Sequence, residues 1–135
     1  MIPSSIQSAV DILKQRFGDR LSTAKTVRSN HCHTTTQIGR ELPDAVIFAN
    51  DTEDVATVVA VCRDYRCPII PFGVGSSLEG HVNAPKGGVS IDLNAMDKVL
   101  AVNEDDLDAV VQPGVTREAL NIYLRDKGLF FPIDP

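Results

Sequence analysis

The sequence predicts an α+β fold, in which a small parallel βαβ unit and an antiparallel hairpin are flanked by helices. Two short apolar runs, residues 45–49 and 69–72, stand on either side of a segment with helical periodicity, which is the pattern of a strand–helix–strand crossover. Two later apolar runs, residues 98–103 and 107–112, are joined by acidic residues and predict a hairpin. Helical stripes near both ends of the chain supply the flanking helices.

The first helix is expected over residues 4–17. Its apolar residues are spaced four, three and four apart and therefore share one face: Ile6, Val10, Leu13 and Phe17. We expect Ser4 or Ser5 to cap its beginning and Gly18 to end it. The helix is predicted to pack on the outside of the domain.

Residues 19–42 have no strong period and contain the cluster His31, Cys32 and His33. On an extended segment the two histidines would share a face, and Cys32 would not. No second ligand pair with the spacing of a metal site occurs in the chain, so we predict a polar loop without a metal. The three cysteines of the chain follow no disulfide pattern, and reduced thiols are expected.

The crossover helix is expected over residues 52–65. Asn50, Asp51 and Thr52 form a capping cluster, and the next two residues are acidic, which suits the beginning of a helix. Its predicted inward stripe is Val55, Val58, Val59 and Cys62. Because the helix joins two strands as a crossover, we expect those strands to run parallel.

Three elements follow the crossover. Residues 88–93 alternate in polarity and predict a third strand, and the hairpin over residues 98–112 comes next, with an acidic tip that we interpret as solvated. A helix is then expected from Thr116 to Lys127, with Gly128 as its terminator. Its predicted inward residues are Leu120, Tyr123 and Leu124.

The strand at residues 69–72 runs into a stretch rich in glycine and serine, residues 71–81. Its glycines can adopt backbone angles closed to other residues, and successive N–H groups in such a turn can form an anion-binding concavity. The spacing fits neither a P-loop nor a dinucleotide-binding fingerprint. Ligands of open sheets sit beyond the carboxyl ends of strands, which favours a phosphate cradle over the alternative of a plain Gly/Ser-rich turn.

Composition excludes several classes of function. The net charge is −5 and no basic stripe is present, which argues against a nucleic-acid partner. No apolar run approaches the ~20 residues that a membrane helix needs, and the first residues lack the features of a signal peptide. We expect a cytoplasmic protein, with peripheral association with a membrane as the open alternative.

Four stretches, taken in this order and spacing, carry a family resemblance: LPDAVIFANDTEDV (42–55), CPIIPFGVGSSLEGH (67–81), GGVSIDLNAMDKVLAVNEDDLDAVVQPGVT (87–116) and LFFPIDP (129–135). The chain resembles the N-terminal part of an FAD-linked oxidase of the vanillyl-alcohol-oxidase type. The branch it resembles is that of flavin-dependent D-lactate dehydrogenases and the glycolate oxidase flavoprotein subunit. The implied fold is the N-terminal half of an FAD-binding PCMH-type domain, truncated, over residues 43–135, preceded by an N-terminal helix and connecting segment over residues 1–42.

The resemblance implies a set of FAD-binding residues. In that family the glycine loop wraps the FAD pyrophosphate with its amides, a strand end approaches the cofactor, and a Pro-x-Asp-Pro element lies near the flavin. Some relatives attach FAD through a histidine directly after the glycines; Ser76 occupies that position, so non-covalent FAD is expected. The implied residues are Pro71, Phe72, Gly73, Val74, Gly75, Ser76, Ser77, Leu78, Gly80, Gln112, Pro113, Gly114, Pro132, Asp134 and Pro135.

The activity that the resemblance implies for the complete protein is oxidation of a 2-hydroxy acid, of the D-lactate or glycolate type, to a 2-oxo acid. The family's catalytic and substrate-binding residues lie beyond residue 135, so no catalytic residue and no metal site is assigned here. We expect this fragment to bind FAD weakly or not at all by itself, to be inactive, and to self-associate through uncovered apolar surface. The alternative is a non-catalytic nucleotide-binding, phosphate-binding or interaction module.

Overall fold

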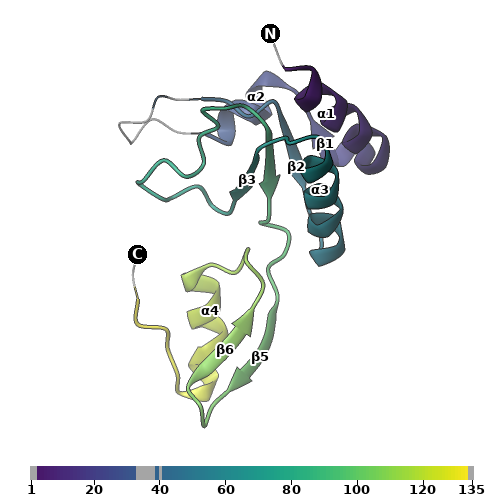
Figure 1. Ribbon diagram of the computed structural model, residues 1–135. Helices are drawn as coiled ribbons and strands as arrows, with labels where there is room; N and C mark the ends of the chain where they lie inside the picture. Colours follow the sequence, from purple (N-terminus) through teal and green to yellow (C-terminus); the bar gives the residue numbers. More distant parts are fainter. Residues whose placement is uncertain (1–2, 33–38, 40, 134–135) are drawn as a thin grey trace.

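The computed structural model describes residues 3–32, 39 and 41–133. The chain forms two parts, which Figure 1 shows one above the other. The first part is a four-stranded sheet with three α-helices, and the second is a two-stranded hairpin with one α-helix. A single connection after the fourth strand links them in the sequence. The α+β class predicted from the sequence is confirmed.

The larger sheet has the strand order β1-β2-β4-β3. Its strands are β1 (Leu21–Ser22), β2 (Ala45–Phe48), β3 (Ile69–Phe72) and β4 (Val89–Asp92). Both β2 and β3 pair with β4 in parallel, whereas β1 is an antiparallel edge strand beside β2. The two crossover strands are therefore parallel, as predicted, but β4 lies between them and provides their hydrogen bonds. This central place explains why every residue of β4 is buried.

Helices α1 (Ser4–Phe17) and α3 (Thr52–Asp64) contact each other and form the core together with the sheet. The predicted α1 stripe is confirmed, because its apolar residues are all buried. Gly18 ends the helix with φ of 56°. The core is made by residues of both helices and the strands: Ile6, Ala9, Val10, Leu13, Phe17, Leu21, Ala45, Ile47, Val58, Val61, Cys62, Val89 and Ile91.

Two details of the predicted helices α1 and α3 are wrong, and one is confirmed. Neither Ser4 nor Ser5 caps α1, because both lie inside the helix and Pro3 occupies the capping position. In α3, Val59 is 45% exposed and Val61 is buried in its place, since spacings of three and four from Val58 define the face that meets the sheet. The predicted cap of α3 is confirmed, because Asp51 accepts a hydrogen bond from the Asp54 amide at 2.8 Å.

The segment between α1 and β2 contains elements that periodicity does not reveal. A short 3₁₀ turn, η1 (Gly18–Arg20), leads into β1, and α2 (Lys25–Asn30) follows. Helix α2 buries none of its own residues, so its sequence lacks an apolar stripe. It contacts β2 and brings His31, directly after its last turn, to the sheet.

The second part consists of β5 (Val99–Asn103), β6 (Asp108–Val111) and α4 (Arg117–Leu124), which is followed by η2 (Arg125–Lys127). The antiparallel hairpin is confirmed, and so is the cap of α4, since the Thr116 hydroxyl accepts from the Ala119 amide at 3.1 Å. Gly128 ends the helical segment in the left-handed conformation.

Two further expectations for this part need correction. Tyr123 is 52% exposed. Of the three residues predicted to face inward, only Leu120 and Leu124 are buried. The acidic tip is not purely solvated, because Glu104 pairs with Lys127 at 2.7 Å. No helix within the described ranges combines the length and apolar character needed to cross a bilayer.

The adjacent valines of α3 provide a matched test of the core. Val58→Ala is expected to lower the free energy of unfolding by about 2 kcal/mol, because it removes two methyl groups from a fully buried site and leaves a cavity. Val59→Ala makes the same change in the same helix at an exposed site, and its loss is expected to be near zero. Urea unfolding checks this; equal losses for the two variants would contradict the packing of α3.

Candidate functional site

Three parallel strands stop in register at the same end of the sheet. Phe48, the last residue of β2, pairs with Asp92, the last of β4, which in turn pairs with Phe72, the last of β3. Residues paired in register point to the same face of a sheet, so the three side chains form a row. The glycine loop leaves the sheet directly after Phe72, and the connection to the hairpin leaves directly after Asp92.

His31 lies on this row. Its ring centroid is 4.3 Å from that of Phe72 and 5.9 Å from that of Phe48, and its Nε2 is 2.9 Å from Oδ2 of Asp92. Only 6% of His31 is exposed, so the prediction that it belongs to a polar loop is wrong. His33 is outside the described residues, and the described ones contain no group of three side chains suited to a metal.

The hydrogen bonds of His31 determine its charge. Nδ1 lies 2.8 Å from the Val27 carbonyl oxygen and Nε2 faces the Asp92 carboxylate, and both partners can only accept. Both ring nitrogens can donate at once only in the imidazolium form, so this pair of acceptors favours that form. Burial lowers the pKa of His31, but the hydrogen bond to Asp92 and then that to Val27 outweigh it, and the pKa is raised.

Asp92 continues the chain of contacts to the glycine loop. Its Oδ1 accepts from the backbone and side-chain N–H groups of Asn94, at 2.9 and 2.8 Å. The same Asn94 side chain donates to the carbonyl oxygen of Gly73 at 2.7 Å. Burial raises the pKa of Asp92, but the hydrogen bonds from His31 and Asn94 outweigh it and lower the pKa.

The glycine loop keeps its amides available. Gly75 has φ of 69°, and a Cβ there would come within 2.7 Å of the Phe72 ring, so only glycine fits against the ring in this conformation. Within the described part of the chain, none of the N–H groups of residues 73–78 donates a hydrogen bond. The side chain of Ser77 is engaged, since its hydroxyl is 2.9 Å from Nδ1 of His81.

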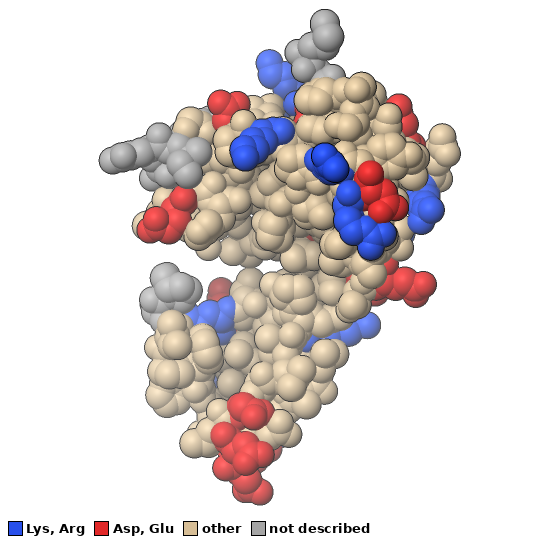
Figure 2. Space-filling view, viewed as in Figure 1, with Lys and Arg blue, Asp and Glu red and all other residues tan. Residues whose placement is uncertain are grey.

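A cavity of about 370 Å³ lies between the two parts of the chain. Val74, Ser76 and Asn94 line one side, and residues 113–118, which lead into α4, line the other. Figure 2 shows the hollow between the sheet part above and the hairpin part below. The first amides of α4 lie at this wall, where the helix dipole favours an anion.

Gly114 lets the cavity wall formed by residues 113–118 lie close to the backbone around Asn94 on the other side. A Cβ at this position would lie 2.6 Å from the Leu93 carbonyl oxygen, 2.7 Å from that of Asn94 and 2.8 Å from that of Met96. The Gly114 amide donates to Met96 at 2.8 Å. Only a residue without a side chain allows the turn before α4 to approach the end of β4 so closely.

The structure brings some of the predicted site residues together and not others. Val74, Ser76, Pro113 and Gly114 line the cavity, and the rest of the glycine loop adjoins it. Gln112 is engaged in the hairpin, where its side chain accepts from the Lys98 amide at 3.0 Å. Asp134 and Pro135 are outside the described residues.

Sequence reasoning missed several residues of this site: Asn94, Val115, Thr116, Arg117 and Glu118 in the cavity wall, and the His31–Asp92 pair behind it. Asn94 could have been found, because it follows a predicted strand at the end where ligands bind. His31 gave no such signal, since nothing in the sequence links it to Asp92.

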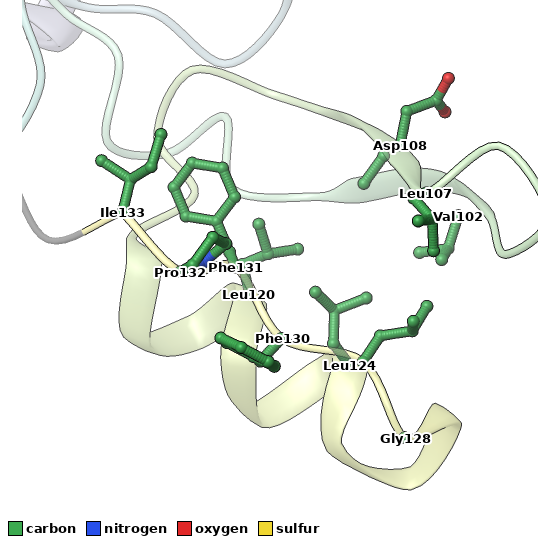
Figure 3. Close-up of a pocket in the computed structure, with 12 residues that line it drawn as sticks. Val102, Leu107, Asp108, Leu120, Leu124, Gly128, Phe130, Phe131, Pro132 and Ile133 are labelled. Atoms are coloured by element: carbon green, nitrogen blue, oxygen red, sulfur yellow. The ribbon is translucent and has the colours of Figure 1, made fainter.

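A second cavity, of about 520 Å³, lies in the hairpin part (Figure 3). Its lining is largely apolar: Val102, Leu107, Ala109, Leu120, Leu124, Leu129, Phe130, Phe131, Pro132 and Ile133. Figure 3 shows the aromatic rings of Phe130 and Phe131 beside α4. Pro132, predicted near the flavin, lines this cavity instead of the one beside the glycine loop.

Comparison with known proteins identifies the family. A family model described as an FAD binding domain matches residues 43–135. The chain belongs to this family. FAD is accordingly its cofactor, and the fold and the family predicted from the sequence are confirmed.

Similar proteins agree with this assignment. A probable mitochondrial D-lactate dehydrogenase of Danio rerio is 41% identical over 98% of the chain, and the glycolate oxidase subunit GlcD of Bacillus subtilis is 35% identical over 71% of it. The chain spans 27% and 20% of the lengths of these relatives. The solved structure of 4-ethylphenol oxidase from Gulosibacter chungangensis superposes with a TM-score of 0.82 at 28% identity, over 99% of this chain and 27% of that one.

The chemistry of the cavity wall fits an FAD diphosphate. A diphosphate is an acceptor with negative charge. The wall offers the amides of residues 73–78, which donate to no acceptor within the described residues, together with the Ser76 side chain and the beginning of α4. At Gly75 a side chain would collide with Phe72, so glycine is what allows the loop to lie against that ring. Residues 73–78 of the loop contain no carboxylate, so the loop offers its donors without a negative charge of its own.

Gly114→Ala is expected to lower the free energy of unfolding by about 1–3 kcal/mol, because the added methyl group meets three carbonyl oxygens of the backbone, which cannot turn aside. Gly73→Ala is the control, since a Cβ there meets no atom within 4 Å. Urea unfolding of both variants checks the prediction. An unchanged midpoint for Gly114→Ala would show that the two walls are not held together at this residue.

Proposed function

We propose that the amides of residues 73–77 and the first turn of α4 bind the diphosphate of FAD on the two sides of the cavity. The observation that carries this proposal is that the loop amides make no hydrogen bond within the described residues, although they border a cavity. Successive amides of a glycine loop that no protein acceptor engages can converge on an anionic acceptor from outside.

For the complete parent protein we propose oxidation of a 2-hydroxy acid, of the D-lactate or glycolate type, to a 2-oxo acid. Support comes from the names of the relatives, a probable D-lactate dehydrogenase and a glycolate oxidase subunit. Bound FAD would supply the two-electron chemistry. The residues of this chain would hold and orient the cofactor, and none of them is assigned as acid, base or substrate ligand.

Several narrower assignments belong to the same proposal. Pro71, Phe72, Leu78 and Gly80 complete the loop that approaches the cofactor, and Gln112, Pro132, Asp134 and Pro135 would approach it from the hairpin part. FAD would be held without a covalent bond, because Ser76 provides no imidazole. Residues 1–42 would precede an FAD-binding portion over residues 43–135.

The 135 residues alone are proposed to bind FAD weakly and to have no dehydrogenase activity, because both walls of the cavity open to solvent and no catalytic group is present among the assigned residues. Self-association is also proposed. The apolar side chains of Leu107, Phe130 and Ile133 are 76%, 73% and 59% exposed, and burying such surface is favourable. A location in the cytoplasm stays a prediction.

The test is a titration of the ¹⁵N-labelled chain with FAD, ADP and riboflavin in separate experiments. FAD and ADP are expected to shift the amide resonances of residues 73–77 and of the first turn of α4, because both carry a diphosphate. Riboflavin carries no phosphate and should leave the loop unchanged. Unshifted loop amides with FAD at millimolar concentration would contradict the proposal.

The same titration separates the alternative function. A plain phosphate-binding or nucleotide-binding module should prefer ADP or treat the two diphosphates alike, whereas an FAD-binding site gains further contacts from the flavin. Tight stoichiometric binding of FAD would contradict the expected weakness of the 135-residue chain. Sedimentation at several concentrations tests self-association in the same samples, and a monomer at all of them would contradict it.

A further inference from the structure

The buried pair of His31 and Asp92 is not part of the cavity wall, yet it is linked to the wall by two routes. One route is a chain of hydrogen bonds from His31 to Asp92, from Asn94 to Asp92, and from Asn94 to the Gly73 carbonyl, with distances of 2.9, 2.8 and 2.7 Å. The other is packing: His31 stacks on Phe72, whose ring lies against Gly75.

The hydrogen-bond route depends on charge. Asn94 can donate to Gly73 and to Asp92 at once because its side-chain nitrogen carries two hydrogens. A carboxylate that accepts from His31 on one oxygen is held in one orientation, with its other oxygen directed to Asn94. Loss of a proton from His31 removes one of the two donors that its acceptor-only partners require.

Among the described residues, the surroundings of His31 contain few charged groups. Helix α2 contributes the Val27 carbonyl, β2 and β3 contribute the rings of Phe48 and Phe72, and β4 contributes Asp92. Among the described residues, Asp92 is the one charged group that acts on the imidazole. A change in the charge of His31 therefore acts on Asp92 and on no other negatively charged group among the described residues.

We propose that His31 is a positioning residue for the cofactor loop: as an imidazolium it orients Asp92, which orients Asn94, which holds the Gly73 carbonyl and so directs the amides that follow it. The loop would be ordered for the cofactor while His31 is charged and would loosen when it is neutral. This inference deepens the proposed FAD site and rests on it for the identity of the ligand.

The sign of the pH dependence follows from the raised pKa of His31. A group whose pKa is higher in the folded chain contributes its full stabilisation below its ordinary value of about 6.5, and loses it as the pH rises through the raised pKa. Ordering of the loop should therefore decline on the alkaline side. Asp92, whose pKa is lowered, stays charged throughout that range.

The deciding experiment is made without flavin, so that failure of the FAD proposal does not affect it. His81→Gln serves as the reference chain, because the His81 ring contacts Ser77 within the loop. The pH is raised from 5 to 9 while NMR follows the His31 Cε1–H resonance and the Val74 amide, which belongs to the same peptide group as the Gly73 carbonyl. Both are expected to change with one midpoint, above about 6.5.

Asn94→Ala, in the same reference chain, breaks the route at an exposed residue and should not impair folding. His31 should still titrate in it, but the Val74 amide should no longer follow. His31→Gln should abolish the change at Val74 as well. A Val74 amide that does not follow His31 in the reference chain, or that still follows it in Asn94→Ala, overturns the proposal.

Binding of FAD gives a second readout. In the reference chain the dissociation constant is expected to rise about threefold to tenfold as the pH passes the His31 midpoint, which is the size of effect expected when one hydrogen bond that orders the loop is lost. In Asn94→Ala, FAD binding should be weaker at low pH, and its dissociation constant should change little with pH. A dissociation constant that rises equally with pH in both chains would also overturn the proposal.

Discussion

The alignment of three strand ends is the constraint on which the rest of this structure depends. Because β2, β4 and β3 run parallel and stop on the same row, Phe48, Asp92 and Phe72 meet side by side on one face. The His31 ring packs against these three side chains. The glycine loop and the link to the hairpin both begin at this end of the sheet, so Val74, Ser76 and Asn94 on one side of the cavity follow directly from it. Residues 113–118 on the other side come from the hairpin part.

The cavity itself is a product of close backbone approach. Gly114 lets the turn before α4 rest on the carbonyl oxygens after β4, and Gly75 lets the loop rest on the Phe72 ring. Both contacts exclude a side chain. The Gly114 amide donates to Met96, whereas the amides of residues 73–78 donate to no acceptor within the described residues. The chain belongs to an FAD-binding family, and the proposed diphosphate site uses the loop amides because a diphosphate needs donors that the fold has not already used.

Periodicity and capping residues predicted most of the elements, because each depends on neighbours in the sequence. The α1 stripe, the Asp51 and Thr116 caps and the hairpin are all local features. The errors at Val59 and Tyr123 have a different origin: a helix that has apolar residues on more than one side can be turned in several ways, and only its contacts choose one.

The sequence by itself determined most of the strands and helices, the glycine loop and the family, since these follow from local spacing and from a motif, whereas β1 and α2 were missed. Tertiary structure alone decided the sheet order, with β4 between the crossover strands, and the meeting of His31 with Asp92 across 61 residues of chain. It also decided that residues 113–118 face the loop. The reason is physical: hydrogen bonds and packing between distant segments depend on where the chain returns, and no local pattern records that.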